Sequence, residues 1–317
     1  MDFWLDLTMT NPTATVAAAQ PGILAPPPPL ATYLLFQAPE AGVEELVETL
    51  SDNFAEAIAA GTLVVGLGSN LLDSADSAIG YHRYQQPNDG YALSPANPAD
   101  LAIWLRGSDR GELLHLSRNL VDALGQSCRL TGITHGFTYK RRPTDDDVIV
   151  HDLSGFEDGT ENPQGQEAVE TALLSSSATH LNGGSLWALQ SWQHNFEWLN
   201  AASDTEKEHA IGRSLLDNHE LDDNSPWAHV ARTEQESFAP EAHMLRRSMP
   251  WCDDQLNGGL MFSCFAHSLY PFEIQLSRMR GCEDGIQDAI FQFSKIIGTS
   301  YFWCPPIDET GRLRYVE

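Results

Sequence analysis

Residues 31–142 alternate between short apolar runs and amphipathic helix patterns, and this order constrains the fold more than any other feature of the sequence. Two helices are predicted, at residues 43–60, where Gly61 ends the pattern, and at 108–124, where Ser108 takes the N-cap position. Four apolar runs around them have the length and composition of strands: residues 31–37, 62–68, 101–107 and 132–142. The order strand, helix, strand, strand, helix, strand, with room for one further strand in the middle, indicates a split βαβ unit, the ferredoxin-like arrangement.

The second half of the chain repeats this pattern in a weaker form. Residues 259–279 run from a strand into a helix as residues 101–120 do, and both segments end in Leu-Ser-Arg followed by an apolar residue. This similarity favours a duplication of the strand and helix unit. The other elements predicted in this half are a strand at 184–199, a polar helix at 203–212, a further helix at 285–298 and a closing strand at 300–305.

The length of 317 residues predicts about two domains. A proline-rich run at residues 20–30 is expected to be neither helix nor central strand. It separates an N-terminal extension, residues 1–20, from a first domain at 21–150. The charged segment at residues 143–152 marks the boundary with a second domain at 151–317.

The charge balance is strongly acidic, with 44 Asp and Glu residues against 18 Lys and Arg residues and a formal net charge of −26. Such a surface repels nucleic acids and anionic membranes, so neither is expected as a partner. A solvated acidic coat is the main interpretation. The alternative is that the charge attracts cationic substrates or metal ions.

A cytoplasmic location is expected. No apolar stretch reaches the ~20 residues needed to span a bilayer, and the N-terminus carries acids where a signal peptide has a basic region. The five cysteines are scattered and form no CxxC pair, which argues against a disulfide framework and against a structural zinc site.

Three short segments hold residues that could carry chemistry. GFEDGTENP (155–163) places Asp158 between two glycines, SPWAHVARTE (225–234) holds an isolated His229, and MLRRSMP (244–250) holds adjacent arginines. Each has an ordinary explanation: an Asp-Gly turn, a histidine satisfied in the core, and a solvated corner. The first segment does not have the spacing of a calcium loop, and no histidine pair has zinc-hydrolase spacing.

Taken together and in this order, the segments resemble the dye-decolourising peroxidases, and most of all the bacterial B-type branch. The resemblance extends to QPGILAPPP near the start, to IGRSLLDNHELDD at 211–223, to a G-L-x-F strand after LRRSMP, and to GTSYFWCP from residue 298. It implies an α+β protein of two ferredoxin-like domains with antiparallel sheets, of the dimeric α/β-barrel type. Haem b is then held mainly by the second domain.

The resemblance also implies roles for individual residues. His229 matches the proximal iron ligand, Asp158 the distal aspartate of the GxxDG motif, and Arg246 the distal arginine. Asp288 falls where B-type members carry the carboxylate that hydrogen-bonds the proximal histidine. Arg213 falls where an arginine near the haem propionates is expected.

Three further residues belong to the expected cofactor site. Gly159 and Thr160 continue the GxxDG motif after Asp158. Ser248 stands where many B-type members have Asn, two residues after the distal arginine. A serine still offers a hydrogen bond, but it is shorter, so the polar shell around peroxide is expected to be looser.

The implied activity is a haem-b peroxidase that uses hydrogen peroxide to oxidise dyes, phenols or other bulky donors in one-electron steps through a ferryl intermediate. Asp158 would move the proton of peroxide, and an unperturbed aspartate (pKa about 3.9) predicts an acidic optimum unless burial raises the pKa. Bulky donors would react at the surface through Trp or Tyr, and the chain has eight of each. The family suggests a homo-oligomer, a dimer or larger.

Three alternatives stay open at this point. A haem-handling protein, for storage or for iron release from porphyrin, would need His229 but neither Asp158 nor Arg246. Chlorite-dismuting chemistry shares the architecture but requires no distal carboxylate. A ferredoxin-like module that binds a small molecule would be colourless.

Overall fold

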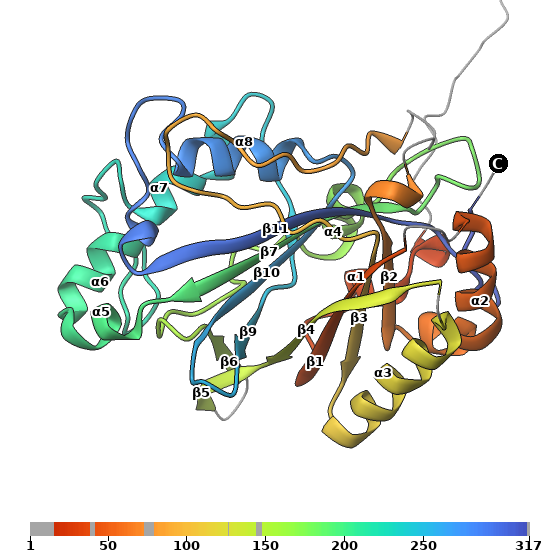
Figure 1. The fold of residues 1–317 in the computed structure, drawn as a ribbon. Helices are drawn as coiled ribbons and strands as arrows, with labels where there is room; N and C mark the ends of the chain where they lie inside the picture. Colours follow the sequence, from red (N-terminus) through yellow and green to blue (C-terminus); the bar gives the residue numbers. More distant parts are fainter. Residues whose placement is uncertain (1–15, 39–41, 73–78, 126, 144–147, 316–317) are drawn as a thin grey trace, which may run out of the picture.

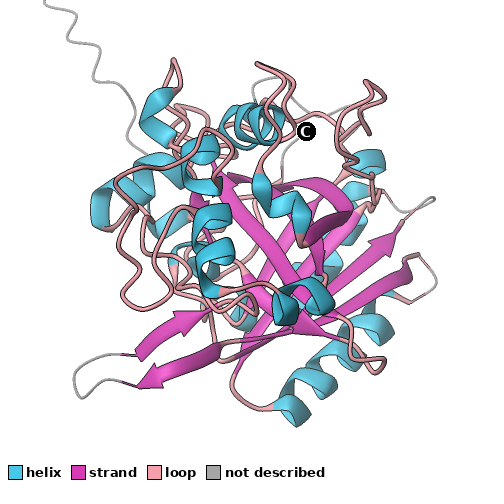
Figure 2. Cartoon of the chain, turned by 90° about the vertical axis from the view of Figure 1, so that its left-hand side faces the viewer, coloured by secondary structure: helices cyan, strands magenta, loops and turns pink. Residues whose placement is uncertain are grey.

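The computed structural model describes residues 16–38, 42–72, 79–125, 127–143 and 148–315, and they form a closed sheet with its longer helices outside it (Figures 1 and 2). The main sheet has the order β7-β11-β2-β3-β1-β4-β9-β10-β8, and β7 also pairs with β10. The strands from β7 to β10 therefore close into a ring, and β8 adds to the outside of β10. No helix among the described residues is long and apolar enough to cross a membrane.

The first half of the ring has the predicted strand and helix order. Its strands lie in the order β2-β3-β1-β4 and are antiparallel, which is the arrangement of a ferredoxin-like unit. Helices α2 and α3 pack on the outer face. The bounds are β1 Leu30–Gln37, α2 Val43–Ala59, β2 Leu63–Leu67, β3 Leu101–Gly107, α3 Arg110–Leu124 and β4 Arg129–Phe137.

The second half repeats the same strand order, β11-β7-β10-β9, with α8 between β10 and β11. The similarity between residues 101–120 and 259–279 therefore has a structural basis, because β3–α3 and β10–α8 are equivalent units of the two halves. The bounds are β7 Ser185–His194, β8 Leu245–Arg246, β9 Met249–Cys252, β10 Gly258–Ala266, α8 Tyr270–Met279 and β11 Ser294–Cys304. The predicted α+β class is confirmed, whereas the domain boundary at residue 150 stays a prediction.

The two faces of the ring carry different cores. Alternating residues of each strand point inward, where Trp104 and Trp187 both stack on Phe265, with ring centroids 6.1 and 5.4 Å away. The other face packs outward, as Leu34 does against Leu50 of α2. The outer face of the second half is covered by α8 and by the short helix α7, His229–Thr233.

Several local predictions were wrong. Asp109, not Ser108, caps α3, because its side chain accepts the N–H of Glu112 at 2.9 Å. The proline-rich run begins with a helical turn, α1 Pro21–Leu24, since proline suits a first helical position. The predicted strand at 132–142 is divided between β4 and β5 Tyr139–Pro143, and the segment 143–152 contains a strand, β6 Val148–His151. The predicted strand at 184–199 ends earlier, because α5 Phe196–Ala201 follows β7. The predicted helix at 285–298 is wrong, because β11 begins within it.

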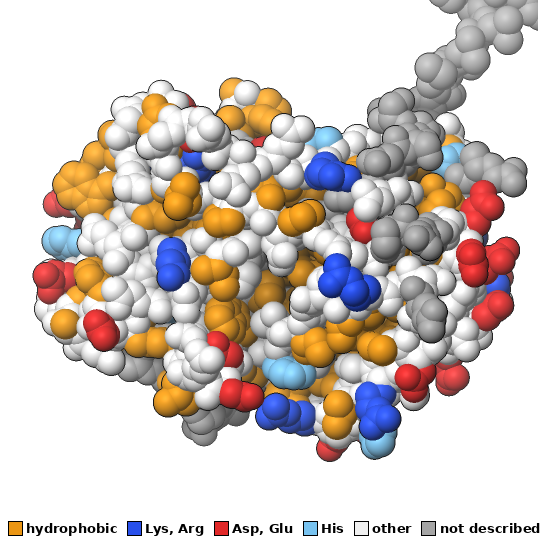
Figure 3. Space-filling model, in the orientation of Figure 1, with side chains coloured by type: hydrophobic (Ala, Val, Ile, Leu, Met, Phe, Trp, Pro, Cys, Tyr) orange, Lys and Arg blue, Asp and Glu red, His pale blue; other side chains and the backbone are white. Residues whose placement is uncertain are grey.

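The remaining helices are short. They are α4 Gly165–Ala172 and α6 Asp204–Ile211, and 3₁₀ turns lie at Val16–Ala18, Ser69–Leu71, Gln235–Ser237 and Ala289–Gln292. Acidic side chains gather over α2, at the right of Figure 3. This is the solvated face expected from the composition.

Gly259 of β10 offers a test of the ring, because a Cβ there would lie 2.0 Å from the carbonyl oxygen of Trp192 on β7. We expect Gly259→Ala to lower the free energy of unfolding by about 1–3 kcal/mol, the usual cost of overpacking. Gly132→Ala on β4 is the control, because its Cβ would meet Leu35 at an ordinary 3.6 Å. Denaturant unfolding measures both. Equal stability of the two variants would contradict the close approach of β7 and β10.

Candidate functional site

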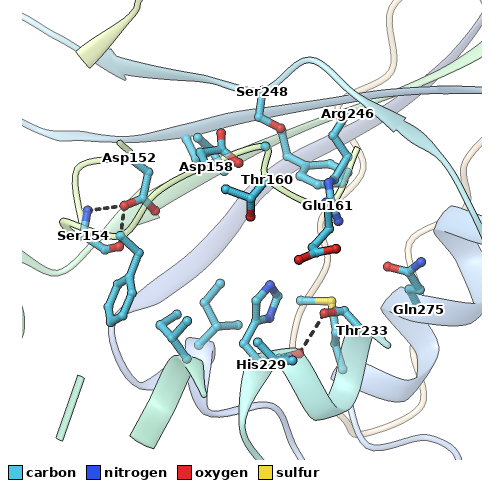
Figure 4. A pocket seen from close by; sticks show the side chains of 18 of the residues that line it. Asp152, Ser154, Asp158, Thr160, Glu161, His229, Thr233, Arg246, Ser248 and Gln275 are labelled. Carbon is cyan, nitrogen blue, oxygen red and sulfur yellow. Dashed lines mark hydrogen bonds between the residues drawn. The ribbon is translucent and has the colours of Figure 1, made fainter. Parts of the chain in front are cut away.

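A cavity of about 370 Å³ lies on the outer face of the second half-sheet, under α7 and α8. Figure 4 shows Asp158, Arg246 and Ser248 on one side of it and His229 reaching in from the other. All four were predicted as site residues from positions far apart in the sequence. The fold brings them to one cavity.

The wall of the cavity combines an apolar part with many polar and charged side chains. Apolar side chains from the sheet and from the helices face the space, namely Trp192, Leu260, Phe262, Val230, Phe272, Leu276, Met279 and Ile290. Such a lining suits a large flat ligand with few polar groups, and it leaves the polar side chains to fix the orientation of the ligand.

The loop that carries Asp158 is shaped by turns. The carboxylate of Asp152 accepts the backbone N–H groups of Ser154 and Gly155 at 2.8 and 3.2 Å. Gly155 and Gly159 have φ of 103° and 82°, a region where glycine is favoured. The predicted Asp-Gly turn is therefore present, and it also directs the carboxylate of Asp158 into the cavity.

Asn162 ties this loop to the strand that carries Arg246. Its amide oxygen accepts the backbone N–H of Arg246 at 2.8 Å, and its amide nitrogen donates to the carbonyl oxygens of Arg246 and Gly159 at 3.1 and 3.3 Å. One side chain thus fixes the two segments that carry Asp158 and Arg246 relative to each other. Sequence reasoning missed this role, although Asn162 stands inside the motif GFEDGTENP.

Asp158 and Arg246 are half-buried at the cavity and influence each other electrostatically. Burial, and then the nearby charge of Asp152, raise the pKa of Asp158 to about 6, and Arg246 opposes that shift. Burial lowers the pKa of Arg246, and Asp158 opposes this in turn. A carboxyl group with a pKa near 6 can accept and return a proton close to neutral pH.

His229 is the first residue of α7, and its Nδ1 lies 2.8 Å from the carboxylate of Asp288. Asp288 is only 2% exposed. Its other carboxylate oxygen accepts the backbone N–H of Ile290 at 2.8 Å, so Asp288 caps the 3₁₀ turn Ala289–Gln292. The predicted contact between the two residues is present, although Asp288 precedes a 3₁₀ turn and is not inside a helix.

The other predicted residues also line the cavity. Arg213 lies at its rim and donates to Glu161 and Glu220 at 3.1 and 3.4 Å. Thr160 accepts a hydrogen bond from Asn218 at 3.3 Å, and Gly159 lies beside it. Ser248 is buried, and its hydroxyl accepts the backbone N–H of Ser263 at 3.4 Å.

The residues present fit a haem. His229 uses Nδ1 for Asp288, and its ring points into the cavity, which leaves Nε2 on the cavity side for a metal. The apolar walls suit a porphyrin plane, and the guanidinium of Arg213 at the rim suits the carboxylates of its edge.

Known proteins are similar to this chain in both sequence and fold. Residues 150–309 match the family model for the C-terminal part of Dyp-type peroxidases. A dye-decolorizing peroxidase of Mycolicibacterium paratuberculosis is 27% identical over 302 residues, which cover 90% of this chain and 83% of the relative.

Solved structures agree over nearly the whole chain. A DypB variant from Rhodococcus jostii in complex with haem has a TM-score of 0.79 at 26% identity, and the match covers 95% of this chain and 100% of that one. The encapsulated DyP-type peroxidase of Mycobacterium smegmatis has a TM-score of 0.80 at 27% identity, with 93% and 98% covered.

The bonds of Asn162 predict a clear loss of stability in Asn162→Ala. The variant leaves a backbone N–H of Arg246 without its partner at a part-buried position, which costs up to about 1–3 kcal/mol. Asn53→Ala is the control, because Asn53 is exposed and its amide donates to the carbonyl of Thr49 in its own helix. Thermal unfolding compares the two, and a loss no larger than that of the control would remove Asn162 from its positioning role.

Proposed function

This chain belongs to the Dyp-type peroxidase family, and from that premise we propose that its cavity binds haem b and that it uses hydrogen peroxide to oxidise dyes, phenols and other bulky donors. One observation carries the proposal. The half-buried residues Asp158 and Arg246 lie across one cavity from His229, whose Nδ1 bonds the buried carboxylate of Asp288.

The chain's residues divide the work of holding the cofactor. His229 would bind the iron through Nε2, and Arg213 would pair with a carboxylate at the porphyrin edge. Gly159, Thr160 and Ser248 line the cavity together with Asp158 and would contact the cofactor from there. When bound, haem would supply the iron and the electrons with which the O–O bond is cleaved.

Asp288 is a positioning residue. Its buried carboxylate accepts the Nδ1 hydrogen of His229, which fixes the ring orientation and keeps the lone pair on Nε2. The same contact makes the imidazole a stronger electron donor. This favours peroxide chemistry over simple binding of oxygen.

Asp158 and Arg246 act on the peroxide side. Asp158 takes the proton from one peroxide oxygen and returns it to the other, which then leaves as water. Arg246 keeps its positive charge and stabilises the negative charge that builds on the oxygens. Ser248 is shorter than the asparagine expected there, so we propose a wetter shell around bound peroxide.

The haem-handling alternative fits this cavity less well. Storage of haem or removal of its iron needs His229 but gives no role to two half-buried ionisable residues, Asp158 and Arg246, opposite it. Partial desolvation of such groups costs free energy, and haem storage makes no use of them. Asp158 and Arg246 therefore favour turnover with peroxide.

We also propose a cytoplasmic location and a homo-oligomer. Five free cysteines, three of them buried, support a reducing compartment. The encapsulated relative of M. smegmatis makes packaging a question for this chain as well.

A comparison of two variants tests the roles of Asp158 and Arg246 in the haem-reconstituted protein. We expect Arg246→Leu to slow the reaction with hydrogen peroxide more than Asp158→Ala does, because only the arginine stabilises the charge of the breaking bond. Losing one such donor typically costs about 100-fold or more. Arg118→Leu, at an exposed position on α3, is the control. Stopped-flow absorbance gives the rates, and the reverse order would contradict these roles.

The pH dependence follows from the pKa of Asp158, which burial raises to about 6. The proton acceptor is the carboxylate, so the rate of the peroxide reaction should fall as pH drops below 6 and level off above it. Below the pKa the fall approaches tenfold per pH unit. Asp158→Asn should lose this limb. A rate that stays constant from pH 7 down to about 4 would contradict the assignment, because even an unperturbed aspartate has a pKa near 3.9.

A further inference from the structure

Bulky donors need a way to pass electrons to a cavity they cannot enter. The cavity of about 370 Å³ is the space that we assign to the haem itself, with Arg213, Glu161 and Glu220 at its rim. Large aromatic donors must then react at the surface, through a side chain that can lose and regain one electron. Tryptophan and tyrosine are the candidates.

Few of the tryptophan and tyrosine side chains are exposed to solvent. Among the described residues, the Trp and Tyr side chains that are clearly exposed are Trp227 at 48%, Tyr91 at 43% and Tyr139 at 37%. Tyr139 begins the separate hairpin β5–β6, and Tyr91 lies in the long segment between β2 and β3. Trp227 is the exposed tryptophan of this group.

Trp227 is joined to the iron side of the cavity by short connections. Two peptide units separate it from His229, so their Cα atoms lie no more than about 7.6 Å apart. Its carbonyl oxygen accepts the backbone N–H of Ala289 at 2.8 Å. Ala289 follows Asp288, whose carboxylate bonds Nδ1 of His229 at 2.8 Å.

A groove beside Trp227 gives a donor a place to bind. It has a volume of about 320 Å³, and it is lined by Trp227, Gln287, Asp288, Ala289, Phe291 and Gln292. The indole and Phe291 offer aromatic surface, and the two glutamines offer hydrogen bonds.

We propose that Trp227 is the residue at which aromatic donors too large for the cavity reduce the enzyme, which rests on the peroxidase function proposed above. Trp227 gives one electron toward the cavity, and its indole radical takes one electron from a donor in the groove. With a neutral aromatic amine, two donors each lose one electron, and one hydrogen peroxide takes up both electrons and two protons to give two waters. Trp227 ends unchanged.

The test uses the haem-reconstituted protein, hydrogen peroxide and tetramethylbenzidine as the aromatic amine. Trp227→Phe keeps the ring but removes the easily oxidised indole, and its exposed position makes a folding defect unexpected. Tyr139→Phe is the matched control at another exposed aromatic. Each protein is measured for its reaction with peroxide alone and for turnover with the amine.

We expect Trp227→Phe to lower the kcat for the amine by about tenfold or more, while the peroxide reaction and the control stay within about twofold of wild type. A second readout is independent of turnover. After peroxide without donor, peptide mass mapping of the wild type should find oxygen added to Trp227.

Unchanged kcat in Trp227→Phe, or oxygen added to Tyr91 or Tyr139 in place of Trp227, would overturn the assignment. A wild-type protein that does not react with peroxide at all would instead overturn the proposed function, and this inference with it. The reaction of the wild type with peroxide therefore distinguishes a wrong assignment of Trp227 from a wrong proposed function.

Discussion

The hydrogen bond between His229 and Asp288 is the contact on which the proposed chemistry depends. Asp288 is a buried carboxylate, and such a group is tolerated only when its oxygens are hydrogen-bonded. Its partners are Nδ1 of His229 and the backbone of Ile290, so α7 and the segment before β11 are fixed to each other. With Nδ1 used in this way, Nε2 is left for the cavity.

The duplicated fold explains why only one half carries the site. In the first half, long helices α2 and α3 cover the outer face of the sheet and bury residues such as Leu50 and Leu120 against it. In the second half, the five residues of α7 and the ten of α8 cover the corresponding face. Shorter helices leave a cavity there, and the GxxDG loop supplies its remaining wall.

The sequence predicted the strands and helices of the first half well, because their apolar periodicity is regular. It failed at residues 285–298, where β11 alternates buried Ile296 with exposed Lys295 and Ile297 and the pattern was taken for a helix. His229, Asp158, Arg246 and Asp288 were predicted through the family resemblance. Asn162 and the apolar wall were not, because their contacts join segments distant in sequence and leave no local pattern.

The most direct test of the account concerns the bond from His229 to iron. Visible absorption and electron paramagnetic resonance spectra would be recorded for the ferric reconstituted protein, for His229→Ala and for His209→Ala, whose histidine is exposed on α6. The account predicts that only His229→Ala loses the spectrum of histidine-bound haem, and that added imidazole restores it. An unchanged spectrum in His229→Ala would contradict the account.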